Sequence, residues 1–319
     1  MKRVVVFGGG TGLSCLLSGL KLFPIDVTAV ITVSDNGSST GVLKEELDIP
    51  AVGDVGKVLL AMSNADDALL ELLSYRFSKS GTLHNHPVRN ILMSALIDIK
   101  GSLTEAARYM GQILQIKGTV LPLTEDKVEL IGESDGVSFV GEEAVSQNIR
   151  HIRRLRYDHD ITVTGEVKQR LLDADLVIFS PGSLYTSIIP HLIAPEIGEV
   201  LKEIKAPLMY VSNLVTQPGE TDGYDVSGHI RVLNRYLYLY DRHIEYVIAN
   251  NAEIDARIIE KYLKTENKTI VHLDREKISA QNASVIEGNI LSIEDETIRH
   301  NALKTAYLIF SYLMDETGA

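Results

Sequence analysis

The feature that most constrains this chain is a short apolar run, Val4–Phe7, that passes directly into four glycines among five residues, Gly8–Gly12. A helical pattern follows at Leu13–Leu20. A buried strand, a turn with almost no side chains and a helix N-terminus direct several backbone N–H groups at one point, where the helix dipole adds roughly half a positive charge. The segment therefore predicts a phosphate site, although a tight strand-to-helix turn without a ligand would have the same sequence.

The spacing of the glycines separates the classes of phosphate site. A dinucleotide fingerprint reads G-x-G-x-x-G, and Gly8 and Gly10 fit its first two glycines while Leu13 stands at the third. A P-loop is excluded because no Gly-Lys-Ser/Thr follows. The loop predicts a nucleotide or phosphate ligand. Because the fingerprint is incomplete, an NAD-dependent oxidoreductase is the function that the loop favours least.

Composition excludes several further classes. The 31 Lys and Arg residues against 43 Asp and Glu residues give a net charge of −12, which disfavours a general nucleic-acid-binding surface. A single cysteine, Cys15, forbids an intramolecular disulfide and fits a reducing compartment. The apolar run after Met1–Arg3 is too short for a signal peptide, and no stretch approaches a membrane span. We expect a cytoplasmic protein with no nucleic-acid partner and no membrane span.

The histidines give no metal signal. The chain has nine of them, but H-E-x-x-H is missing and no third ligand accompanies His84 and His86. We assign no resident metal and no catalytic residue.

Strand and helix patterns alternate along most of the chain. Beyond the first strand, buried strands are expected at 27–33, 175–179, 207–214 and 245–250, and helices at 54–63, 66–77 and 88–99. Alternation of this kind predicts a Rossmann-like α/β fold, a mostly parallel sheet with helices on both faces.

The middle of the chain differs from the rest. Residues 119–170 are richer in charge and turns, with short alternating stretches at 128–131, 137–140 and 152–156. We expect a small α+β insertion there, rich in β-structure, which splits a nucleotide-binding core into 1–118 and 171–319. A final helix is expected over 296–313, with an apolar stripe that packs on the core.

Small polar loops follow five of the predicted strands. They lie at 8–12, 34–41, 180–187, 215–223 and 250–251. Because ligands of open α/β sheets bind outside the carboxyl ends of the strands, the loops predict one shared polar cleft.

The candidate binding residues are mostly backbone, hydroxyl and amide groups of these loops. They are Gly9, Gly10, Thr11, Gly12, Asp35, Asn36, Ser38, Ser39, Asp54, His86, Asn90, Gly182, Ser183, Thr186, Asn213, Thr216 and Gln217. Asp35 could bind ligand by accepting from ribose hydroxyls or by holding Mg²⁺ beside a pyrophosphate. Purely structural roles are also open, since Asp35 could form an Asx-turn and Asp54 could cap a helix. Ser183 is not read as a hydrolase nucleophile, because G-x-S-x-G is missing.

Three segments carry a resemblance to a known family. They are 8–14, 181–190 and the long string Thr-Gln-Pro-Gly-Glu-Thr-Asp-Gly-Tyr at 216–224. They resemble the YvcK branch of the CofD-like superfamily, described as gluconeogenesis factors. The resemblance implies a Rossmann-like core with an insertion, and a cytoplasmic protein that supports cell shape and wall synthesis during gluconeogenic growth. It further implies binding of UDP-sugars such as UDP-N-acetylglucosamine, whereas the CofD branch are Mg²⁺-dependent 2-phospho-lactate transferases.

The sequence departs from that branch at three loops. The usual Asp-Asp-Gly-Gly-Ser-Ser-Gly-Arg stands here as 35–42 without its second acid and its arginine, and the usual Pro-Gly-Asp-Ile-Arg-Asn as 52–57 without its arginine. The usual His-Ser-Leu/Phe-Gly-Asn is His86-Pro87-Val88-Arg89-Asn90. Lost arginines remove bidentate phosphate clamps, although Lys57 or Arg89 can restore a charge.

These departures affect catalysis more than binding, because backbone amides remain. We therefore expect a nucleotide-sugar-binding regulator without turnover. The alternative is a transferase acting on a nucleotide-activated phosphate donor, with Asp35 and Asp54 holding Mg²⁺. The expected partners are the nucleotide-sugar ligand, a protein of cell-wall synthesis and further copies of the chain.

Overall fold

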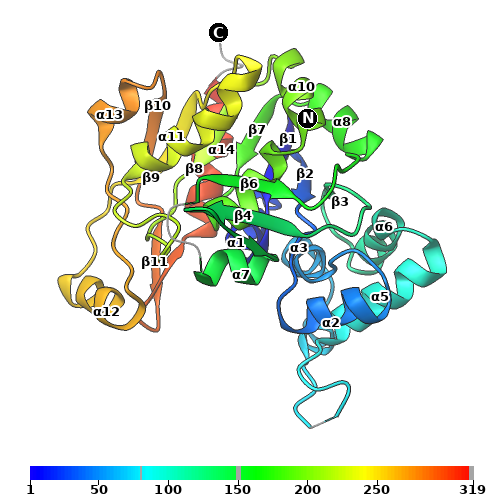
Figure 1. Cartoon of the computed structure of the whole chain (residues 1–319). Helices are drawn as coiled ribbons and strands as arrows, with labels where there is room; N and C mark the ends of the chain where they lie inside the picture. The colour runs from blue at the N-terminus through cyan, green and yellow to red at the C-terminus, as the bar shows by residue number, and fades with distance from the viewer. Residues whose placement is uncertain (80, 149–151, 316–319) are drawn as a thin grey trace.

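A computed structural model describes residues 1–79, 81–148 and 152–315. Its centre is a seven-stranded sheet in the order β10-β9-β8-β7-β1-β2-β3, in which every neighbouring pair is parallel (Figure 1). The strands are Arg3–Gly8 (β1), Asp26–Ile31 (β2), Thr119–Pro122 (β3), Leu176–Phe179 (β7), Leu208–Val211 (β8), Tyr246–Asn250 (β9) and Ser284–Gly288 (β10). The predicted parallel sheet is confirmed.

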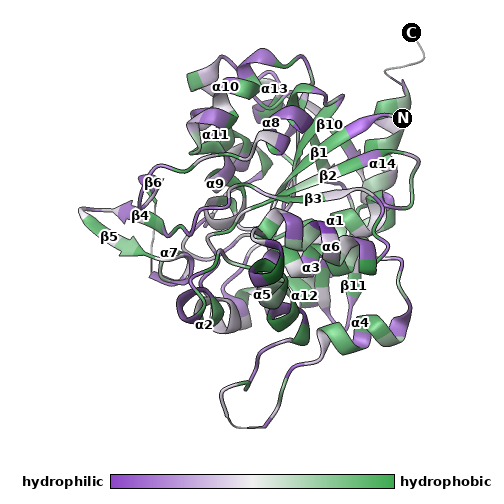
Figure 2. Cartoon of the chain, turned by 90° about the vertical axis from the view of Figure 1, so that its right-hand side faces the viewer, coloured by the Kyte–Doolittle hydropathy of each residue, from purple (hydrophilic) through white to green (hydrophobic). Residues whose placement is uncertain are grey.

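Helices cover both faces of this sheet. One face carries α1 (Gly10–Leu20), α3 (Gly53–Met62), α6 (Leu103–Ile113) and α14 (Ala302–Asp315), and the other carries α8 (Gly165–Leu172), α10 (Pro195–Glu203) and α11 (Val226–Leu237). Figure 2 shows the apolar colour concentrated in the strands between these layers. The central strands are buried on both sides, which explains why their sequences are continuous apolar runs instead of alternating ones.

The remaining helices lie around the core. They are α2 (Ser38–Glu46), α4 (Asp67–Ser74), α5 (Val88–Lys100), α7 (Glu142–Asn148), the π-helical turn η1 (Leu184–Ile188), α9 (Ile189–Leu192), the 3₁₀ turn η2 (Tyr238–Tyr240), α12 (Ala256–Glu266) and α13 (Arg275–Ser279). The helices predicted at 54–63, 66–77 and 88–99 correspond to α3, α4 and α5. None of the described helices is long and apolar enough to cross a membrane.

The middle of the chain forms a small antiparallel sheet in the order β5-β4-β6, built from Leu130–Ser134 (β4), Val137–Val140 (β5) and Arg154–Tyr157 (β6). These are the three stretches that the sequence predicted. However, the expected boundary at 119 is wrong in one respect, because residues 119–122 are β3, the edge strand of the central sheet, paired with β2. Four residues between Gly118 and Leu123 are too few to show a strand period.

The predicted helix over 296–313 is wrong at its start. Leu291–Glu294 (β11) and Thr297–His300 (β12) form a hairpin, joined by two residues with positive φ, and α14 begins only at Ala302. The expected apolar stripe holds in part: Ala306, Ile309 and Leu313 are buried, but Leu303 is 55% exposed.

Candidate functional site

The sheet order places a crevice at the end of β1. The chain leaves β1 toward β2 on one side, while β7 pairs with the other side of β1. Ligands of open parallel sheets bind at such a reversal of strand order. The loops after β1 and β7 meet closely there, since a Cβ on Gly12 would lie 2.1 Å from the Pro181 carbonyl oxygen. Position 12 therefore requires glycine.

The glycine loop presents the start of α1 without a cap. Gly9 is the N-cap residue, no side chain accepts from the first turn, and no acidic residue lies in that turn. Gly10 has φ of 62°, a conformation that favours glycine. The first N–H groups of a helix have no partner within the helix, so this uncapped N-terminus offers donors to an anion.

A buried histidine lies below the loop. His191 Nε2 lies 3.1 Å from the backbone nitrogen of Gly8, and the imidazole packs against the ring of Phe7. Burial lowers the pKa of His191 to about 3, so the ring is neutral. Its Nε2 also lies 3.1 Å from the Val30 carbonyl oxygen, so it accepts from the Gly8 N–H in one tautomer and donates to Val30 in the other. Sequence reasoning missed this contact because residues 8 and 191 are far apart along the chain.

A cleft of about 670 Å³ opens in front of the glycine loop. Nine of the predicted residues line it: Gly9, Gly10, Thr11, Gly12, Gly182, Ser183, Asn213, Thr216 and Gln217. Its wall also contains Lys268 and His300, which sequence reasoning did not single out. A neighbouring hollow shares Thr11 and His300 with the cleft and adds Arg299, an exposed side chain with no ion pair to a described residue. The cleft thus has cations that its loops alone did not predict.

The loop after β7 is held by two side chains from the other segments. Asn213 accepts from the N–H of Gly182 at 2.9 Å and donates to its carbonyl oxygen at 2.8 Å. The Ser183 hydroxyl donates to the Glu220 carboxylate and caps the next turn by accepting from the N–H of Thr186. Burial raises the pKa of Glu220, and the hydroxyl of Ser183 opposes that rise. Asn213 and Glu220 therefore position the Gly182 loop, and Asn213 and Ser183 also line the cleft.

The far side of the cleft is fixed to the segment before β10. Thr216 Oγ1 lies 3.1 Å from Thr269 Oγ1 and accepts from the N–H of Thr269. Gln217 donates to Glu220 at 2.7 Å. The specific string at 216–224 thus forms one wall of the cleft.

A group of carboxylates lies beside the glycine loop. Asp54 Oδ2 would be 2.8 Å from a Cβ on Gly9, and Asp35 Oδ1 accepts from the N–H of Gly37 in an Asx-turn. Burial raises the pKa of Asp35, and the Asp54 carboxylate raises it further. Asp54 does not cap α3, whose N-cap is Val52, because its carboxylate pairs with Lys57 at 2.9 Å.

Glu142 joins this acidic end from α7, in the insertion. Burial raises its pKa to about 7, and the charges of Asp35, Asp54 and Glu220 add to the rise while the Thr186 hydroxyl opposes it. Thr186 therefore belongs to this end of the site. No sequence signal marked Glu142, because it lies in a charged helix more than 75 residues from the other acids.

One of these carboxylates already has a cationic partner. The Lys57 ammonium pairs with Asp54, and although burial lowers the pKa of Lys57, the Asp54 and Asp35 carboxylates together raise it above its ordinary value, so the lysine stays charged. Among the described residues no group of three acidic, histidine or cysteine side chains could hold a metal ion.

The other predicted residues lie away from the cleft wall. Ser39, His86 and Asn90 form a buried cluster, with Ser39 Oγ 2.8 Å from His86 Nδ1 and accepting from the Asn90 amide at 3.2 Å. Ser38 is exposed at the start of α2, and the Asn36 amide oxygen accepts from the N–H of Glu143 in the insertion. These residues support the loop after β2.

Comparison with known proteins agrees with this geometry. A model of the family described as 2-phospho-L-lactate transferase CofD matches residues 4–291. A Thermotoga maritima protein is 40% identical over 314 residues, covering 96% of this chain and 98% of its own. The gluconeogenesis factor of Bacillus subtilis is 36% identical, covering 98% of both chains. The chain belongs to the CofD family, in its gluconeogenesis-factor group. This confirms the resemblance drawn from the three loop segments.

A solved structure of the same group has the same fold. Protein BH3568 of Bacillus halodurans superposes with a TM-score of 0.92 at 36% identity, covering 97% of this chain and 99% of its own. This chain and that solved protein thus share the Rossmann-like architecture.

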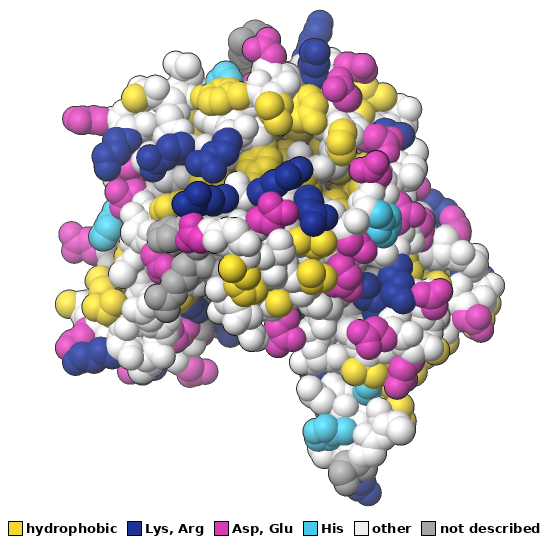
Figure 3. All heavy atoms as spheres, viewed as in Figure 1, with side chains coloured by type: hydrophobic (Ala, Val, Ile, Leu, Met, Phe, Trp, Pro, Cys, Tyr) yellow, Lys and Arg dark blue, Asp and Glu magenta, His cyan; other side chains and the backbone are white. Residues whose placement is uncertain are grey.

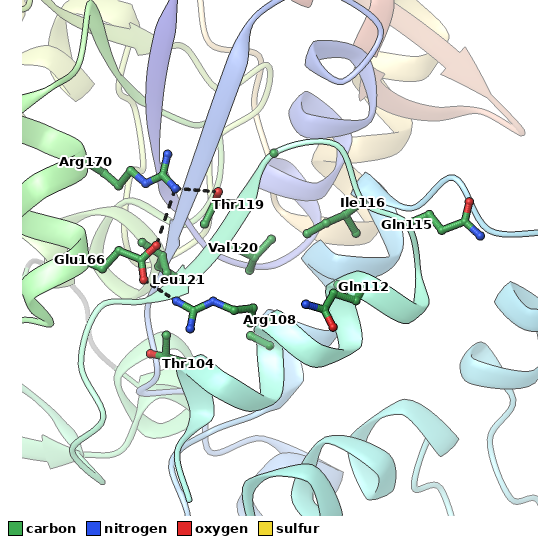
Figure 4. Close-up of a pocket in the computed structure, with 13 residues that line it drawn as sticks. Thr104, Arg108, Gln112, Gln115, Ile116, Thr119, Val120, Leu121, Glu166 and Arg170 are labelled. Carbon is green, nitrogen blue, oxygen red and sulfur yellow. Dashed lines mark hydrogen bonds and ion pairs between the residues drawn. The ribbon is translucent and has the colours of Figure 1, made fainter. Parts of the chain in front are cut away.

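A second hollow lies at the β3 edge of the sheet. It has about 290 Å³ between α6, β3 and α8 (Figure 4). Glu166 lies between Arg108, at 2.7 Å, and Arg170, at 3.7 Å, so the two guanidinium groups are already paired. Residues 118–121 line this hollow, so it runs along β3, the edge strand of the sheet, and not across the carboxyl ends of the strands, where ligands of such sheets bind. The cleft at the glycine loop is the candidate site.

Proposed function

We propose that this protein binds a nucleotide sugar, such as UDP-N-acetylglucosamine, in the cytoplasm and acts as a regulator without turnover. In this proposal the bound ligand reports sugar-nucleotide supply to cell-shape and wall synthesis during gluconeogenic growth. The observation that carries it is the uncapped N-terminus of α1 at the β1/β7 reversal, in front of a cleft of about 670 Å³.

The cleft has the chemistry that a diphosphate needs. The N–H groups of Gly10, Thr11 and Gly12 would donate to one or both phosphates, and Arg299 and Lys268 supply cations at the rim. Lys268 is paired with Glu266 at 2.6 Å, so Arg299 is the freer of the two charges.

The rest of the wall suits the polar parts of the ligand. Asn213, Thr216 and Gln217 present amide and hydroxyl groups, which hydrogen-bond sugars and ribose in either direction. The volume lies within the range of small-molecule sites, at the size of a nucleotide sugar and larger than a lone phosphate needs.

Isothermal titration tests this function directly. We expect UDP-N-acetylglucosamine to bind, UDP to bind more weakly, and N-acetylglucosamine alone not to bind, because the diphosphate supplies most of the free energy. Failure of every nucleotide sugar to bind, with protein that is folded by circular dichroism, would refute the proposal.

A second candidate function is the transferase chemistry for which the family model is described. It is favoured by Glu142, whose pKa of about 7 suits a general base beside a phosphate donor. The test is incubation with Mg²⁺, a nucleotide-activated phosphate donor and a hydroxy-acid acceptor, followed by mass spectrometry. Product that forms with the wild type and is lost in Glu142→Gln would favour the transferase over the regulator.

A further inference from the structure

One face of the molecule carries a row of basic side chains. Figure 3 shows Lys and Arg side chains gathered over α11 and β6. Arg231 and Arg235 are exposed one helical turn apart on α11. On β6, Arg154 is exposed and Arg156 half-buried, while Leu155 and Tyr157, which alternate with them, are buried. We call these four residues the arginine face. Both of its elements pack against α9.

Three members of the arginine face lack a carboxylate partner. Arg156 is paired with Glu133 at 3.2 Å. Arg154, Arg231 and Arg235 form no ion pair with any described residue, in a chain whose net charge is −12. Most exposed cations of such an acidic chain have a carboxylate nearby, so three uncompensated arginines on one face give a local positive potential.

Aromatic side chains accompany these arginines. A Cβ on Gly228 would lie 3.1 Å from the Tyr224 side chain and 3.5 Å from the Arg231 guanidinium, which places the two groups side by side. Burial raises the pKa of Tyr236, and the Arg235 charge opposes that rise, so these two groups are also close. Beyond α11, Tyr238 and Leu239 are 60% and 77% exposed. Arginine and tyrosine are the residue types that dominate binding energy at protein interfaces.

We propose that the arginine face docks a short acidic segment of a partner protein. Three free arginines match a few carboxylates, which guanidinium groups bind in bidentate fashion. Polybasic membrane segments carry about four to eight Lys or Arg residues, and a nucleic-acid site with about six to ten phosphate contacts is larger still, so three unpaired arginines favour a short acidic segment of a protein. The exposed tyrosine and leucine provide the apolar contacts that a protein partner uses.

The proposal does not depend on the ligand of the cleft. Tyr185, whose N–H donates to Glu220 behind the cleft, is hydrogen-bonded to Tyr224 on the side of the arginine face. The two sites are therefore neighbours. They can still be tested separately, because the arginines of the arginine face do not line the cleft.

The test is fluorescence anisotropy of the full chain with a fluorescein-labelled oligoglutamate peptide. We expect the wild type to bind, and binding to weaken as salt is raised to about 150 mM. Arg231→Glu/Arg235→Glu should weaken binding about tenfold or more. The matched control, Arg257→Glu/Lys264→Glu on α12, makes the same change in net charge at exposed positions and should leave binding within about twofold.

Three results would overturn the proposal. Equal loss of binding in both double variants would show attraction by overall charge alone. A second such result is that the peptide does not bind, but oligothymidylate or phosphatidylcholine/phosphatidylglycerol vesicles bind and need the same arginines. The face would then belong to another ligand. A change in sedimentation velocity of the double variant alone would make the face a contact between copies. Should the charge reversal unfold the chain, Arg231→Gln/Arg235→Gln serves in its place.

Discussion

The candidate site has two ends, the cleft at the glycine loop and the group of carboxylates beside that loop, and they differ in how their groups are supplied. At one end, Gly9–Gly12 present backbone amides whose positions follow from a strand, a turn and a helix in immediate succession. At the other end, Asp35, Asp54 and Glu142 come from three separate segments, and burial together with mutual repulsion raises the pKa of Asp35 and Glu142. The amide end has a fixed polarity at every pH, whereas the charge of the carboxylate end changes near neutrality.

This difference assigns separate roles to the two ends. Backbone donors hold an anion without any titratable group, so the amide end should supply affinity. The carboxylates repel a diphosphate when they are ionised, so the other end should tune that affinity.

The largest expected effect comes from placing a charge in the amide end. Gly10→Asp should weaken binding of UDP-N-acetylglucosamine by at least about 100-fold, since it adds a negative charge beside the diphosphate and disturbs the amides. Gly101→Asp is the matched control, because Gly101 also has positive φ and has no atom near its Cβ position. Titration calorimetry of both variants should show loss only in the first. Equal affinity of Gly10→Asp and the wild type would remove the amide end from the site.

Removing the unpaired cation at the rim should have the next largest effect. Arg299→Ala should weaken nucleotide-sugar binding about tenfold, because a charge-assisted contact to phosphate is lost. Arg257→Ala removes another exposed arginine, on α12, and should change nothing. If both variants bind as the wild type does, Arg299 does not reach the ligand.

A smaller effect should follow from loosening the loop after β7. Asn213→Ala removes both hydrogen bonds to Gly182 and should weaken binding about threefold to tenfold, with a lower melting temperature. Asn64→Ala, which removes one hydrogen bond of an exposed amide far from the cleft, controls for general loss of stability. A fall in melting temperature without a change in affinity would confine Asn213 to a structural role.

The smallest effect should come from the carboxylate end. With a pKa of about 7, Glu142 is mostly neutral at pH 6 and mostly ionised at pH 8. Nucleotide-sugar affinity should therefore fall about twofold to threefold as pH rises through 7, and Glu142→Gln should flatten that part of the profile. A wild-type affinity that is flat between pH 6 and 8 would contradict this role.

Glu142 should also lower the stability of the fold as pH rises. Between its ordinary value of 4.5 and about 7, the folded state holds a proton that the unfolded state has released, so this contribution to stability is lost as pH rises through that range. In thermal unfolding, the melting temperature of Glu142→Gln should rise relative to that of the wild type as pH increases from 5 to 8.

The sequence predicted the amide end of the site better than the carboxylate end. The glycine loop was predicted because strand, turn and helix are local, and the polar loops at the ends of β7 and β8 because strand ends of a parallel sheet meet at one edge. Glu142, Arg299 and His191 were missed because only the tertiary fold brings them to residues 8–12. The start of α14 was placed too early because Ile298, which is buried in β12, continued the apolar spacing of the true helix.

The most direct test of the central claim is a crystal structure of the chain with UDP-N-acetylglucosamine. The account predicts the diphosphate against the N–H groups of Gly10, Thr11 and Gly12, with the Arg299 guanidinium drawn toward it. A diphosphate bound elsewhere, for example in the hollow between α6 and α8, with the glycine loop free of ligand, would contradict it.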